Sequence, residues 1–145
     1  TQVIGVLDWE MATLGDPLMD LGSALAYWIQ EDDDALMKSS RRQPTNLKGM
    51  LTRQQVVDYY LEKTGLQPTN WAFYEVFGLF RLAVIAQQIY YRYYHQQTDN
   101  PAFKGFWILI HALHIRALKL IAQNNTEAQQ LIPEYAAKLQ DILKQ

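Results

Sequence analysis

The sequence predicts a mainly α-helical protein with about five helices and one short amino-terminal β-strand. Apolar residues recur at helical spacing, about 3.6 residues apart, after Pro17, and they surround much of the segment from residue 71 to about 97. Residues that cap or stop helices stand at the ends of several segments. Residues 3–7 instead form a continuous apolar run rich in β-branched side chains, the pattern of a buried strand.

Two helices are predicted from the residues at their ends. Asp16 is a good N-cap and is followed by Pro17, which suits the first helical position, so a helix is expected from Pro17 to about Gln30. Further along, a Thr-x-x-Gln capping box opens a segment that is closed by a glycine. That pattern predicts a second helix over Arg53–Thr64.

Three longer helices are expected in the second half of the chain. The segment from residue 71 to about 97 carries apolar side chains around much of its circumference, which predicts a helix in the middle of the domain. Two more helices are expected over about 103–123 and about 127–144, the last bent or restarted at Pro133. Residues 31–50 lack a sustained period, which predicts a surface loop with room for one helical turn.

Composition narrows the class of protein. The 145 residues are 49% hydrophobic, enough for one core, so a single domain over residues 1–145 is expected. A net charge of −2 disfavours nucleic acid as a partner. Charged and histidine side chains interrupt the apolar runs, so no membrane partner is expected. The absence of cysteine excludes disulfides and thiolate chemistry and is compatible with the cytoplasm, the location we expect.

The predicted strand needs a neighbour. Its backbone donors and acceptors can be paired by a strand that precedes it in a longer parent protein, or by a second copy of the chain. The chain opens at Thr1 and enters the strand almost at once, which indicates a fragment cut from a larger protein. We therefore expect self-association through the strand and the truncated core face, visible in light scattering as a homodimer. A monomer at high concentration would contradict this expectation.

Asp8 is the first candidate for chemistry. It follows the predicted strand directly, and a carboxylate at the end of a buried strand is held in a fixed position at the edge of a crevice. Hard cations such as Mg²⁺ prefer carboxylate oxygens presented in that way. An aspartate after a strand is, however, more often a turn former, and the residue alone leaves both interpretations open.

The wider motif around Asp8 favours the metal-binding interpretation. A hydrophobic strand, Asp8-Trp9, a short loop and then Gly-Asp-Pro-x-x-Asp-Leu over residues 15–21 resemble the signature of the aminoglycoside phosphotransferase and choline kinase-like superfamily. The sequence of this motif is most similar to that of the phosphotransferase-like domains related to acyl-CoA dehydrogenase family members 10 and 11. The resemblance is sharp over residues 1–22 and implies the carboxy-terminal helical subdomain of a protein-kinase-like fold.

The resemblance also implies roles for three aspartates. Asp8 matches the aspartate that holds the Mg²⁺ ions on the phosphates of ATP. Asp20 matches an aspartate that braces the catalytic loop, and Asp16 caps the helix that carries it. The family's His-Gly-Asp-x-x-x-x-Asn loop, which supplies the catalytic base, does not occur in the chain. No catalytic residue is therefore assigned, and the isolated chain is expected to be inactive.

Other residues are weaker candidates, each with a simpler reading. Glu10 could border the metal or a substrate, but a solvent-facing glutamate is the commoner case. Arg81 lies in an apolar run and needs a partner, either a protein carboxylate or an anionic substrate group. Tyr90 could line the substrate pocket, although aromatic residues on a central helix usually pack in the core. The acidic run over residues 31–34 is expected to be hydrated.

Two functions follow from these observations. In the first, the parent protein is an ATP- and Mg²⁺-dependent phosphotransferase acting on a small hydroxyl compound, and this chain forms the substrate side of its cleft. In the second, the chain is a non-catalytic helical scaffold or regulatory module of kinase-like ancestry. The sequence of the fragment is compatible with both.

Overall fold

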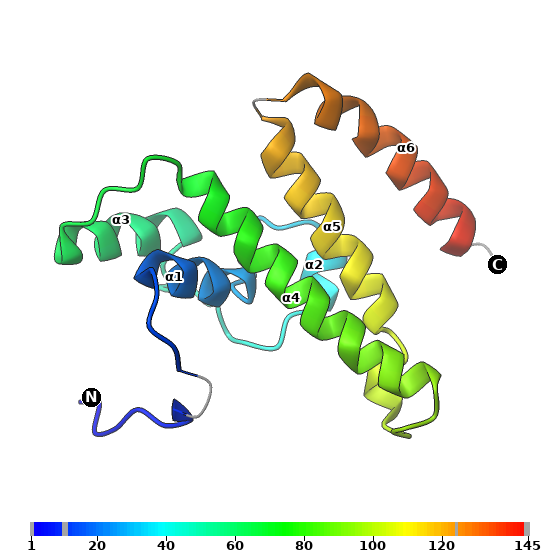
Figure 1. The fold of residues 1–145 in the computed structure, drawn as a ribbon, viewed down its shortest axis with the longest axis horizontal. Coiled ribbons are helices and arrows are strands. Elements are labelled where there is room, and N and C mark those ends of the chain that lie inside the picture. Colours follow the sequence, from blue (N-terminus) through cyan, green and yellow to red (C-terminus); the bar gives the residue numbers. More distant parts are fainter. Residues whose placement is uncertain (1, 10–11, 124, 144–145) are drawn as a thin grey trace.

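The computed structural model describes residues 2–9, 12–123 and 125–143, and this part of the chain is mainly α-helical, as predicted (Figure 1). The helices are α1 (Pro17–Ala26), α2 (Ala35–Ser39), α3 (Arg53–Thr64), α4 (Trp71–Tyr94), η2 (Pro101–Phe103, a 3₁₀ turn), α5 (Phe106–Ala122) and α6 (Thr126–Leu143).

Helix α4 is the centre of the fold. It packs against α1 on one side and α5 on the other, and α6 then packs on α5 (Figure 1). The buried core lies where α1, α2, α4 and α5 meet, and it consists of Ala26, Ile29, Met37, Leu79, Ala112 and Leu113. The prediction of a central helix over this segment is confirmed.

The contact between α1 and α4 depends on two glycines. Gly22 of α1 faces Gly78 of α4, and both residues are buried. A Cβ atom added to Gly22 would lie 2.2 Å from the carbonyl oxygen of Tyr74, and one added to Gly78 would lie 2.1 Å from the carbonyl oxygen of Gly22. The two helix backbones therefore touch at a point where no other residue type fits without moving them.

Local signals account for the starts of α1 and α3 and for the end of α3. The Asp16 carboxylate accepts a hydrogen bond from the Leu18 amide at 2.9 Å at the start of α1. The capping box of α3 is complete, and Gly65 ends that helix with a left-handed φ of 70°. In α6 the helix continues through Pro133 from Thr126 to Leu143, so the proline does not divide it.

The segment 31–50 is mostly exposed but is more ordered than a plain loop. The Asp34 carboxylate accepts a hydrogen bond from the Met37 amide at 2.9 Å and starts the short helix α2. Met37 is only 2% exposed and belongs to the core. The Thr45 hydroxyl is also buried, where it donates to the Ile29 carbonyl at 2.7 Å.

The predicted strand is not formed. Residues 2–8 lack strand pairing, and the part of the chain that the structure describes contains no β-strand. Ile4 is 99% exposed and Leu7 is 86% exposed. The physical reason is the missing partner. A strand is stable only when another strand pairs with its backbone, and the described residues provide no such strand.

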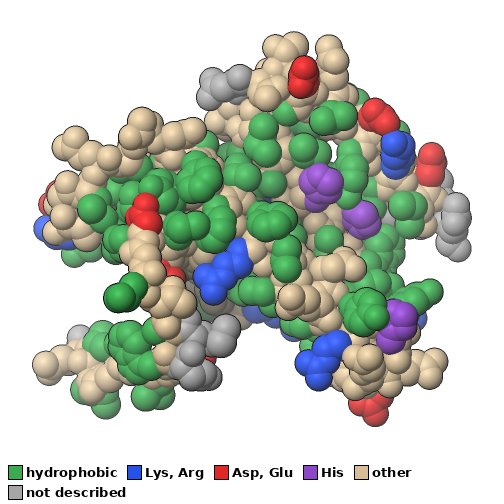
Figure 2. Space-filling model, viewed as in Figure 1, with side chains coloured by type: hydrophobic (Ala, Val, Ile, Leu, Met, Phe, Trp, Pro, Cys, Tyr) green, Lys and Arg blue, Asp and Glu red, His purple; other side chains and the backbone are tan. Residues whose placement is uncertain are grey.

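Apolar side chains also reach the surface of the helical part. Figure 2 shows hydrophobic side chains spread over the face formed by α1, α4 and α5. On α4 the exposed ones are Phe73, Phe80, Val84, Tyr91 and Tyr94. By length and composition alone, the segments Trp71–Tyr94 and Pro101–Ala122 could cross a membrane. A core helix of a soluble protein meets the same criteria, so this is weak evidence.

Candidate functional site

Asp8 has an unusual backbone conformation. Its φ of 72° is in the left-handed region, which aspartate tolerates better than most residues. Beside it, the Trp9 indole Nε1 donates to the Val6 carbonyl at 2.8 Å. The Asp8 side chain is exposed and has no hydrogen bond or ion pair to another described residue. Its carboxylate is therefore free to take a ligand from solvent.

Asp16 joins the start of α1 to α4. One carboxylate oxygen accepts the cap bond, and the other accepts a hydrogen bond from the Tyr74 hydroxyl at 2.7 Å. That hydrogen bond raises the pKa of Tyr74 above its ordinary value, with smaller contributions from burial and the carboxylate charge. Asp16 is thus occupied by structural contacts on both of its oxygens.

Asp20 and Arg81 are brought together in one pocket. A cavity of about 500 Å³ lies between α1 and α4, and both side chains line it. The Arg81 guanidinium contacts the Ser23 hydroxyl at 3.3 Å. Because the Arg81 side chain is exposed, the partner expected from its apolar sequence context is not required. Tyr27 and Tyr60 also line this pocket.

The remaining predicted site residues lie elsewhere. Glu10 is outside the described residues. Tyr90 does not line this cavity, nor a second cavity that lies between α2, α4 and α5. Its ring instead lies 6.2 Å from that of Tyr94 along α4. Outside the predicted site residues, His111 and His114 of α5 both contact Tyr135 of α6. No group of three or more metal-binding side chains occurs in residues 2–9, 12–123 and 125–143.

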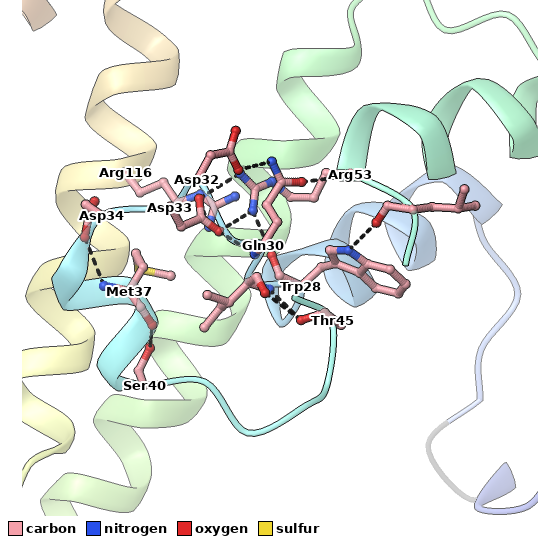
Figure 3. A network of polar contacts seen from close by, with 12 residues as sticks. Trp28, Gln30, Asp32, Asp33, Asp34, Met37, Ser40, Thr45, Arg53 and Arg116 are labelled. Carbon is pink, nitrogen blue, oxygen red and sulfur yellow. Dashed lines mark hydrogen bonds and ion pairs between the residues drawn. The ribbon is translucent and has the colours of Figure 1, made fainter. Parts of the chain in front are cut away.

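A polar cluster that the sequence did not reveal lies at the junction of α3, α5 and the loop after α1 (Figure 3). Arg53 forms a two-pronged ion pair with Asp33, at 2.6 and 2.8 Å, and also donates to the Trp28 carbonyl at 2.8 Å. The Arg116 guanidinium lies 3.8 Å from the same carboxylate, and its buried Nη1 has no hydrogen-bond partner among the described residues. The Asp33 side chain is only 10% exposed.

Burial and the neighbouring charges shift the pKa values of Asp33 and Arg116 in this cluster. Burial alone raises the pKa of Asp33, but hydrogen bonds from Arg53 and the Gln30 amide, with the charges of Arg116 and Arg53, lower it overall. Burial lowers the pKa of Arg116, and the nearby Arg53 charge lowers it further. The cluster thus holds two cations around one carboxylate and fixes the loop to the helices.

Comparison with known proteins identifies the ancestry of the amino-terminal part. Residues 1–51 match the model of the family described as phosphotransferase enzyme family. This match includes Asp8, Asp16 and Asp20. With the mainly helical fold, it indicates phosphotransferase-like ancestry and confirms the resemblance found in the sequence.

Individual relatives extend the similarity beyond this match. Acyl-CoA dehydrogenase family member 10 of Mus musculus is 38% identical over 93 residues, which cover 63% of this chain and 9% of the relative. Family member 11 of the same species is 32% identical over 94 residues, covering 63% and 12%. Probable acyl-CoA dehydrogenase IBR3 of Arabidopsis thaliana is 34% identical over 144 residues, covering 96% and 17%.

The chain thus spans between 9% and 17% of the length of these three relatives. No solved structure matches it.

Proposed function

We propose that this chain is part of an ATP- and Mg²⁺-dependent phosphotransferase that acts on a small hydroxyl compound, and that it forms the substrate side of the cleft. The observation that carries the proposal is the family match over residues 1–51, which contains the Asp8 to Asp20 motif in its complete order. The pocket that Asp20 shares with Arg81 supports it, because it places a carboxylate and a guanidinium in one cavity beside the motif.

Asp8 fits the role of one metal ligand. Mg²⁺ in nucleotide sites is commonly held by one or two carboxylates, with phosphate oxygens and water completing its shell. The exposed Asp8 carboxylate, free of other described residues, can provide one such ligand. When bound, Mg²⁺ neutralises negative charge on the phosphates that react.

Other residues of the chain have supporting roles in this proposal. Asp16 fixes the start of α1 through its cap bond and its bond from Tyr74, which sets the position of Asp20 one turn further on. Asp20 faces the pocket and is available to accept hydrogen bonds from the backbone of a catalytic loop. Arg81 offers an anionic substrate group a cation in the same pocket.

The sequence encoded before Thr1 tests this proposal against the scaffold alternative. We expect a His-Gly-Asp-x-x-x-x-Asn loop within a few dozen residues upstream, because phosphotransfer needs a base and a further metal ligand beside Asp8. If the loop is missing, or its aspartate is replaced, the parent is not a phosphotransferase, and the helical scaffold becomes the better explanation.

A further inference from the structure

A second cavity, separate from the Asp8 to Asp20 motif, reaches into the core. It has a volume of about 460 Å³ and lies between α2, the end of α1, α4 and α5. Its walls include Met37, Ala86 and Leu113, which are 2%, 1% and 0% exposed. Cavities that bind small molecules typically measure about 300–1,000 Å³ and are mostly apolar with a few polar groups. A cavity of this volume lined by core side chains has the character of such a site.

The polar groups of this cavity come from one segment. Ser39, Ser40, Arg42 and Gln43 line it directly after α2. Both serine hydroxyls donate to backbone carbonyls of their own turn, at 2.7 Å each. The Arg42 guanidinium and the Gln43 amide, in contrast, make no hydrogen bond or ion pair with another described residue. The lining thus combines an apolar interior with a cation that has no partner among the described residues.

The lining of the cavity is positively charged. Within the part of the chain that the structure describes, this lining contains Arg42 and no aspartate or glutamate. Lys104, which lies between the lining residues Ala102 and Gly105, adds a second cation close by in the chain. A guanidinium binds a carboxylate through two parallel hydrogen bonds, and such charge-assisted bonds are stronger than neutral ones. A ligand that complements both the apolar interior and the Arg42 cation must therefore have an apolar body and an anionic end.

We propose that this cavity binds a small amphipathic carboxylate, with its apolar body between α2, α4 and α5 and its carboxylate on Arg42. The site shares the walls Tyr27, Leu82 and Ile85 with the Asp20 pocket, so the two cavities are neighbours. The inference goes beyond the proposed phosphotransfer and does not depend on it, because it needs neither nucleotide nor metal.

Binding of decanoate to the chain of residues 1–145, measured by calorimetry without nucleotide or Mg²⁺, tests this site. Decanoate is expected to bind more tightly than decanol, and decylamine should bind least, because Arg42 attracts the first and repels the last. Arg42→Gln is expected to weaken decanoate binding about tenfold or more while leaving decanol binding unchanged. Arg41→Gln, which changes an arginine outside the cavity lining, is the matched control and should have no effect.

Variants that fill the cavity distinguish binding at this site from binding on the exposed apolar surface. Ile89→Trp places a large side chain in the cavity and should abolish binding of decanoate and decanol, with Ile108→Trp as a second variant should the first not fold by circular dichroism. The proposal is overturned if decanoate binds no better than decanol. It is also overturned if the filled variants bind decanoate as the original chain does, or if no decanoate binds at all.

Discussion

Gly78→Ala is expected to lower the free energy of unfolding by about 3 kcal/mol, the upper part of the range for overpacked cores. The added methyl group would lie 2.1 Å from the carbonyl oxygen of Gly22 and 2.9 Å from the Ser23 amide nitrogen. Both are backbone atoms, so α1 and α4 must separate to admit it. The usual gain of about 1 kcal/mol for alanine over glycine in a helix is too small to offset this.

Urea denaturation followed by circular dichroism measures the effect. Gly22→Ala should be similarly destabilising, since its methyl group would meet the Tyr74 carbonyl. Gly15→Ala is the control, because a Cβ at that position meets no atom within 4 Å. Equal stabilities for the Gly78 and Gly15 variants would show that the two helices are not in backbone contact.

Asp33→Asn is expected to cost about 3 kcal/mol or more of stability at neutral pH. The substitution leaves Arg53 and Arg116, whose side chains are 19% and 13% exposed, facing each other without a carboxylate. Removing one partner of a buried ion pair typically costs about 3–5 kcal/mol, since the remaining charge is uncompensated. Asp32→Asn changes a more exposed neighbour in the same acidic run and should have little effect.

The same cluster predicts a dependence on pH. The pKa of Asp33 is lower in the folded protein than the ordinary value, so its contribution to stability is present above that ordinary value. The contribution is lost as the pH falls through the lowered pKa. Unfolding by urea at a series of pH values should show this acid loss in the original chain and a smaller one in Asp33→Asn. An identical acid dependence in both would place the stabilising charge elsewhere.

The sequence predicted the helices better than the contacts between them. Caps and stops are local, so Asp16 and the capping box before α3 marked helix starts correctly. Helix α2 is only five residues long, too short to show a period, and its burial depends on Met37 meeting residues distant in the chain. The strand over residues 3–7 was predicted from side chains alone, whereas a strand also needs a backbone partner.

The polar contacts were harder to predict. Four adjacent acids gave no sign that Asp33 alone would turn inward, since the choice depends on the arginines of α3 and α5. The shared pocket of Asp20 and Arg81 arises from the crossing of α1 and α4, which the sequence does not specify. The roles proposed for Asp8 and Asp20 came from the order of the whole motif, because each aspartate alone also fits an ordinary turn or helix.

The central proposal, that Asp8 is a metal ligand of a longer phosphotransferase, is tested by measuring phosphotransfer by that proposed longer protein. A coupled assay for ADP release is expected to show Mg²⁺-dependent turnover, reduced about a hundredfold or more by Asp8→Asn and unaffected by Asp58→Asn on the exposed face of α3. Residues 1–145 alone should show no turnover. Full activity of the Asp8→Asn protein, or turnover by the isolated chain, would contradict the account.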